Sequence, residues 1–97
     1  MKTINAIHVN NIDNCVTLSG PADAGDTAVY IEDGGEMAVI VQEPVPIWHK
    51  VAVKPVQKGS EIYKYGAVIG IALEDIGLGR HIHVHNTCSP GAGGRCV

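Results

Sequence analysis

The apolar residues of this chain are mostly short and branched, and glycine and proline interrupt them at close intervals. Apolar side chains make up 45% of the 97 residues, yet the chain has no Phe and a single Trp, so Val, Ile and Ala supply most of them. β-Branched residues favour strands, and the 12 Gly and 5 Pro favour tight turns between strands. No segment has the 3.6-residue apolar period of a long amphipathic helix. We therefore expect an all-β domain of short strands.

The pattern of apolar residues and turn residues predicts where these strands lie. We expect strands at residues 3–9, 15–18, 27–31, 37–42, 47–53 and 67–73. Asp33-Gly34-Gly35 predicts a hairpin turn, because Gly readily takes the positive φ that such turns require. Segments 53–62 and 73–82 resemble each other, since each has an apolar residue three positions before a Gly and a β-branched residue three positions after it. We expect each to form one helical or 3₁₀ turn that ends at Gly59 or Gly79 and leads into a strand.

Length and charge limit the possible architectures and partners. The chain is long enough for one domain, which we place at residues 1–88, and residues 89–97 are expected to form a flexible Gly-rich tail. A domain this small buries a modest share of its surface, so association with a partner or with a second copy is expected. The net charge of −3 argues against binding to nucleic acid or an anionic membrane. No apolar stretch suits a membrane span or a signal peptide, which predicts a cytoplasmic location.

Three histidines alternate along one short segment. His81, His83 and His85 precede Asn86, and in a strand all three imidazoles would lie on one face. Clustered imidazoles indicate a metal ion or proton transfer, although strand histidines that only bond their neighbours are the alternative. At about 3.3 Å per residue, His81 and His85 lie roughly 13 Å apart in a straight strand, whereas metal–nitrogen bonds are about 2 Å long. A straight strand therefore offers one ion an adjacent pair, such as His83 with His85, and the remaining ligands must come from elsewhere.

A longer pattern surrounds this histidine run. It comprises His49-Lys50-Val51-Ala52-Val53, Gly59, Ile62-Tyr63-Lys64-Tyr65-Gly66, Ile69-Gly70, Ala72, Asp75-Ile76, Gly79 and His83-Val84-His85-Asn86-Thr87. Over residues 49–87 the chain resembles the SAF domain of the altronate/galactarate dehydratase family, and it is similar to the small subunit of sulfolactate sulfo-lyase. The resemblance implies a β-clip (SAF-type) fold, in which we expect one or two short helical turns.

The resemblance also implies a function. The family is expected to remove water from a 2,3-dihydroxy acid and so form a 2-keto-3-deoxy acid. Its cofactor is a divalent metal, iron(II) or alternatively manganese(II). The catalytic bulk lies in a large partner chain, so this chain is expected to act as a small subunit that shares the metal with that partner and is inactive alone.

Residue roles follow from the same resemblance. His83 and His85 are expected to face the shared active site as metal ligands or as acid and base, and Asn86 to bond substrate hydroxyls or to fix a neighbouring imidazole. Four further residues are expected to bind the sugar-acid substrate: His49, Lys50, Lys64 and Tyr65. For Lys64 the alternative is a solvated surface charge, and for Tyr65 it is packing.

Two other functions remain open at this stage. One is the small subunit of a sulfolactate sulfo-lyase, which carries the same pattern. The other is a non-catalytic SAF module that binds a carbohydrate or a protein. The His-x-His-x-His-Asn ending at residues 81–86 counts against the binding module.

Overall fold

The structure, a computed structural model, describes residues 1–90 and contains only strands and turns over that range. The strands are β1 (Thr3–Ile7), β2 (Cys15–Leu18), β3 (Thr27–Glu32), β4 (Gly35–Ile40), β5 (Lys50–Ala52), β6 (Glu61–Lys64), β7 (Ala67–Ala72), β8 (His81–Ile82) and β9 (Thr87–Cys88). The expected all-β, SAF-type fold is confirmed. No helix in the described range is long and apolar enough to cross a membrane. Residues 91–97, which hold most of the expected flexible tail, lie outside the described residues.

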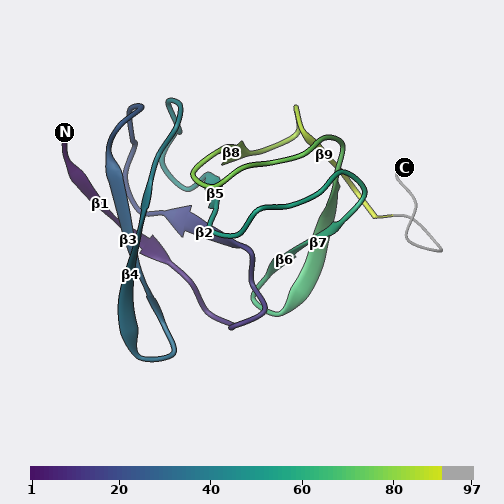
Figure 1. Ribbon diagram of the computed structural model, residues 1–97, viewed down its shortest axis with the longest axis horizontal. Coiled ribbons are helices and arrows are strands. Elements are labelled where there is room, and N and C mark those ends of the chain that lie inside the picture. Colours follow the sequence, from purple (N-terminus) through teal and green to yellow (C-terminus); the bar gives the residue numbers. More distant parts are fainter. Residues whose placement is uncertain (91–97) are drawn as a thin grey trace.

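The strands form two sheets (Figure 1). The larger has six strands in the order β4-β3-β1-β2-β5-β8, and the smaller has the order β6-β7-β9. Neighbouring strands are antiparallel except β1 and β3, which are parallel. The side chain of Asn14 joins the sheets, because it donates to the carbonyl of Glu61 at 2.9 Å and accepts from the Tyr63 N–H at 2.9 Å.

Two groups of buried aliphatic side chains stabilise the sheets. The first surrounds Leu18, Val41 and Val51, and the second surrounds Ile62 and Ile82. Burial of each such side chain is worth about 1.5–3 kcal/mol. Ile82 is 1% exposed, so it anchors β8 in the second group. Since successive side chains of an extended segment alternate in direction, this anchor leaves the flanking His81 and His83 to lie away from the core.

One β-turn recurs four times, at residues 23–26, 46–49, 57–60 and 77–80. In each, the N–H of the fourth residue donates to the carbonyl of the first, over 2.9–3.2 Å. A strand begins directly after each turn: β3, β5, β6 and β8. The residues just before the turns pair across antiparallel bridges, Ala22 with Val45 and Val56 with Ile76. The four turns therefore form two pairs, each joined by a bridge. The sequence similarity predicted only the second pair, at residues 57–60 and 77–80.

The third residue of every turn has a positive φ: Gly25 (93°), Trp48 (66°), Gly59 (86°) and Gly79 (77°). A residue in this left-handed region cannot continue a right-handed helix. The expected helical or 3₁₀ turns before Gly59 and Gly79 are therefore wrong, and both segments are β-turns. The strand expected at 47–53 is shortened for the same reason, because Trp48 turns the chain and β5 starts at Lys50.

The expected hairpin between β3 and β4 is confirmed. Asp33 and Gly34 have φ values of 51° and 76°, which suit a two-residue hairpin turn. The hairpin between β6 and β7 has the same construction, with Tyr65 at 55° and Gly66 at 76°. The carboxylate of Asp13, 1% exposed, accepts from the N–H groups of Tyr65 at 2.9 Å and Gly66 at 2.8 Å. This hairpin turn is therefore held to the segment that precedes β2.

Candidate functional site: a cluster of four histidines

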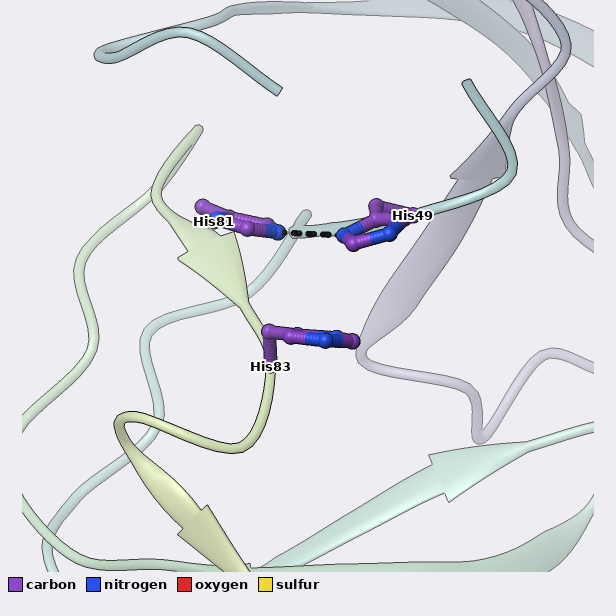
Figure 2. A group of neighbouring side chains, drawn as sticks. All are labelled: His49, His81 and His83. Carbon is purple, nitrogen blue, oxygen red and sulfur yellow. Dashed lines mark hydrogen bonds between the residues drawn. The ribbon is translucent and has the colours of Figure 1, made fainter. Parts of the chain in front are cut away.

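Pairing of β5 with β8 brings together histidines that are far apart in the sequence. His49 ends the turn at 46–49 and precedes β5, while His81 is the first residue of β8 and pairs with Val51. The Nδ1 of His49 lies 2.9 Å from the Nε2 of His81, at hydrogen-bonding distance. The ring of His83 stacks on that of His49 with centroids 4.2 Å apart (Figure 2). We refer to His49, His81, His83 and His85 as the histidine cluster.

The segment after Ile82 is a turn, so the condition of a strand over residues 81–85, under which all three imidazoles share one face, is met only at His81 and Ile82. The N–H of Asn86 donates to the carbonyl of His83 at 3.1 Å, which closes the turn. This turn brings the His85 ring back to within 5.2 Å of the His81 ring, centroid to centroid. The distance limit of a straight strand therefore does not apply to these histidines.

Asn86 holds the backbone of this turn. Its Oδ1 accepts from the His83 N–H at 3.0 Å, and its Nδ2 donates to the His81 carbonyl at 2.7 Å. The side chain is buried, at 4% exposure. Both ends of the amide are thus engaged with main chain that carries the histidines, so the structure favours a positioning role over contact with substrate hydroxyls.

Two sets of potential metal ligands meet at His81. The nitrogens of His49, His81 and His83 lie within 4.8 Å of one another, and so do the donor atoms of Glu43, His81 and His85. Over residues 1–90, no such group of three contains both His83 and His85. The structure therefore places the two predicted ligands in different donor sets that share His81, and it adds His49 and Glu43 as donors.

The environment of two members of the cluster, His81 and His83, favours their uncharged forms. Burial lowers the pKa of His81 to about 4, and the charges of His49, His85 and His83 act in the same direction. Burial also lowers the pKa of His83, with His49 and Lys50 adding to the effect. A neutral imidazole has a free lone pair that accepts a proton or binds a metal ion, so both rings are available for such chemistry. Imidazole nitrogens suit zinc, iron and other first-row ions, and the donor set therefore fits a divalent metal.

A carboxylate and a guanidinium border the cluster. Glu43 accepts from the His81 N–H at 3.2 Å and lies 3.5 Å from the Nη1 of Arg80. Both residues line an open cavity of about 210 Å³ together with His85 and Asn86. Sequence reasoning missed both residues. Glu43 is distant along the chain and belongs to no motif, whereas Arg80 had one signal, its position next to His81.

Lys50 lies on the other side of the cluster. Burial lowers its pKa, and the charge of Lys64 acts in the same direction. It lines a second cavity, of about 220 Å³, with His83 and Val84. Among the described residues, no carboxylate lies within ion-pair distance of its ammonium. A half-buried cation without a counter-ion is suited to bind an anion, which agrees with the substrate-binding role expected for Lys50.

Lys64 and Tyr65 lie apart from the cluster, at the β6–β7 hairpin (Figure 1). The Lys64 ammonium lies 5.0 Å from the centre of the Tyr65 ring, a cation–π distance. The Tyr65 side chain is exposed, and its backbone N–H is bonded to Asp13. Within residues 1–90, no hydrogen bond, ion pair or ring contact joins either side chain to the histidines. The predicted site residues thus fall into two places.

The chain is thus a small all-β domain whose imidazoles cluster at one edge of the larger sheet. The chain belongs to the altronate/galactarate dehydratase SAF domain family, whose sequence model matches residues 4–90. This match covers all nine strands except the first residue of β1. It also extends the resemblance beyond residues 49–87 to nearly the whole described chain.

Individual relatives support the same assignment. The chain is 35% identical to altronate dehydratase of Escherichia coli over 82 residues, which are 84% of this chain and 16% of that protein. It is 41% identical to altronate dehydratase of Bacillus subtilis over 51 residues, 53% of this chain and 10% of that protein. The (2R)-sulfolactate sulfo-lyase subunit alpha of Paracoccus pantotrophus is 34% identical over 58 residues, 60% of this chain and 87% of that subunit. The chain thus spans less than a fifth of the altronate dehydratases that it matches.

Proposed function

We propose that this chain is the SAF module of a metal-dependent lyase that dehydrates a 2,3-dihydroxy sugar acid to a 2-keto-3-deoxy acid. The observation that carries the proposal is the histidine cluster at the β8 edge of the larger sheet, beside Lys50, which has no carboxylate partner among residues 1–90. This edge offers acid–base groups and a cation, and the cavities that the described residues form there are open. The rest of the site belongs to a large catalytic chain, and this chain is inactive alone.

The reaction requires a base, an acid and a Lewis acid, and the histidine cluster suits the first two roles. A base must take the proton α to the substrate carboxylate, and an acid must protonate the departing 3-hydroxyl. A neutral imidazole can take the α-proton, and the imidazolium so formed can give a proton to the departing hydroxyl. His83 and His85 face the shared site in these roles or as metal ligands. When bound, a divalent ion such as iron(II) or manganese(II) supplies Lewis-acid stabilisation of the enediolate. Lys50 binds the carboxylate, with His49 beside it, while substrate contacts by Lys64 and Tyr65 remain predictions.

The relatives support a two-chain arrangement. In altronate dehydratases the matching region is a small part of a long protein, whereas it makes up 87% of the sulfolactate sulfo-lyase subunit alpha of Paracoccus pantotrophus. The second pattern supports the proposal that this chain works with a separate large chain. We propose that the complex is cytoplasmic, as the sequence predicts, and that a homo-oligomer of this chain is one form of it.

The similarity to the sulfo-lyase subunit supports a second candidate reaction. A sulfolactate sulfo-lyase would break a carbon–sulfur bond in a 3-carbon acid that also carries a carboxylate and a 2-hydroxyl. The same imidazoles and Lys50 would serve, because both substrates carry a carboxylate and an acidic proton on the carbon next to it. The two reactions therefore differ in the leaving group, and substrate tests separate them.

The test is reconstitution with a large dehydratase-like chain, sought first among the genes that neighbour this one. We expect the two chains to co-purify, and turnover of altronate, galactarate or sulfolactate with Fe²⁺ to require both. Replacing His83 and His85 together by Ala should lower turnover at least 100-fold, because acid–base groups contribute about 10²–10⁴ in rate. Lys54→Ala, which removes an exposed lysine that pairs with Glu32, is the control and should leave turnover unchanged. Full turnover without this chain, or with the double variant, would contradict the proposal.

A further inference from the structure

We infer that this chain on its own binds one divalent transition-metal ion through His49, His81 and His83. The inference deepens the proposed function, because it assigns the ion to three residues of this chain instead of a His83–His85 pair completed by the partner. It also moves His49 from substrate binding to metal binding. His85 is then free for proton transfer.

The distances suit three ligands of a single ion. The nitrogens of all three rings lie within 4.8 Å of one another, and those of His49 and His81 are 2.9 Å apart. Ligands that bind one ion at about 2.0–2.1 Å lie roughly 3–3.5 Å from each other. The His49–His81 pair therefore needs to open by only a few tenths of an ångström. His83 lies over the His49 ring (Figure 2) and must turn its own ring to aim a nitrogen at the ion.

The backbone holds the three histidines in place without the ion. In the antiparallel register of β5 and β8, Lys50 lies opposite Ile82. His49 precedes Lys50 in the sequence, and His81 and His83 flank Ile82, so the register brings the three histidines together. Asn86 bonds the main chain of His81 and His83 at the same time. A site whose ligands are fixed on paired strands and by hydrogen bonds loses little entropy when metal binds.

The competing set of Glu43, His81 and His85 is less suited to an ion. The Glu43 carboxylate already accepts from the His81 N–H and pairs with Arg80. A cation bound there would lie close to the Arg80 guanidinium and would have to break that pair. Because His81 belongs to both sets, the chain holds one ion at a time, and the all-histidine set is favoured.

Three histidine ligands leave a fourth position free, which is the arrangement of catalytic metal sites. Lys50 shares a cavity with His83, so an ammonium lies beside the ion for an anionic ligand. A carboxylate with a neighbouring hydroxyl, which can chelate a metal through two oxygens, is the chemical class that this combination would take.

The experiment uses the untagged full chain, stripped of metal, and Co²⁺ as the probe. Calorimetry and the visible absorption of bound Co²⁺ should show one ion per chain. His49→Ala and His81→Ala should each weaken binding at least 10-fold and change the absorption bands, and His83→Ala should do the same. Glu43→Gln and His85→Ala are the matched controls, and their affinity should stay within about 3-fold of the parent. Circular dichroism checks that every variant is folded.

Three results would overturn the inference: no Co²⁺ binding by the parent chain, unchanged binding by folded His49→Ala, or loss of binding in Glu43→Gln and His85→Ala. The measurement needs neither a partner nor a substrate. A chain that fails to bind Co²⁺ but still supports turnover with the large chain would refute the site and leave the lyase proposal standing. The reverse result, binding without turnover, would refute the lyase proposal alone.

Discussion

The turns at 46–49 and 77–80 share one backbone path, and each delivers a histidine to the cluster, yet their third residues are Trp48 and Gly79. A β-carbon on Gly79 would lie 1.9 Å from the carbonyl oxygen of Ile40, so packing excludes any side chain there. Trp48 projects into solvent and is 60% exposed. Its φ of 66° is unfavourable for a bulky residue. The comparison shows that close packing makes glycine necessary at one turn, while the positive φ alone is tolerated at the other.

The largest effect is expected at the turn that is closely packed. Gly79→Ala adds left-handed strain of about 1–2 kcal/mol and a clash with the Ile40 carbonyl that costs about 1–3 kcal/mol more. We expect the free energy of unfolding to fall by about 2–5 kcal/mol, measured by urea denaturation. Because the turn leads directly into β8, Co²⁺ affinity should fall as well. If Gly79→Ala were as stable as the parent chain, the turns at 46–49 and 77–80 would not differ in packing.

The next effect concerns the histidine that follows the Gly79 turn. The pKa of His81 is about 4 in the folded chain, against an ordinary value of 6.5, because burial and the neighbouring His49, His85 and His83 disfavour its charge while Glu43 partly offsets them. Between these two pH values His81 therefore binds more protons in the unfolded chain than in the folded chain. The stability that depends on neutral His81 is fully present above pH 6.5 and is lost as the pH falls to 4.

His81→Gln should remove this part of the pH dependence. We expect the metal-free parent to lose about 2–3 kcal/mol more stability than the variant between pH 7 and pH 4. Urea denaturation at a series of pH values measures the difference. Parallel curves for the two proteins would show that burial does not suppress the charge of His81.

A smaller effect is expected at Gly59, where the same type of turn has open space around it. No atom lies within 4 Å of a β-carbon built on Gly59, so Gly59→Ala adds only the strain of its positive φ, about 1–2 kcal/mol. Thermal denaturation next to Gly79→Ala gives the comparison directly. Equal losses in the two variants would mean that φ alone, and not the Ile40 contact, explains the glycine at 79.

The smallest effect, with the opposite sign, is expected at Trp48. Trp48→Gly relieves the left-handed strain and removes a side chain that is mostly in solvent, so stability should rise by up to about 1 kcal/mol. A loss of more than about 1 kcal/mol would mean that the Trp48 side chain contributes to packing despite its exposure. Thermal denaturation distinguishes the two outcomes.

Local sequence chemistry predicted much of the fold. The strand at Cys15–Leu18 and the hairpin at Asp33-Gly34 follow from apolar runs and turn residues, and both are confirmed. The turns before Gly59 and Gly79 were predicted as helical because a 3₁₀ turn and a β-turn share the same hydrogen bond, from the fourth N–H to the first carbonyl. The apolar-to-Gly spacing cannot separate them, since the distinction depends on the φ of the glycine.

The candidate site was predicted less completely, because it depends on strand pairing. The contact between His49 and His81 spans 32 residues and arises from the β5–β8 register, which no local pattern determines. The pairing of His83 with His85 assumed a straight strand, whereas the Asn86 hydrogen bonds bend this segment into a turn. Lys64 and Tyr65 share the sequence motif but lie at another hairpin.

The most direct test is a crystal structure of the chain soaked in Co²⁺, with anomalous diffraction recorded at the cobalt edge. We predict one strong anomalous peak about 2 Å from nitrogens of His49, His81 and His83. A peak bound to Glu43 and His85, or no peak at the histidine cluster at full cobalt loading, would contradict the assignment of this site.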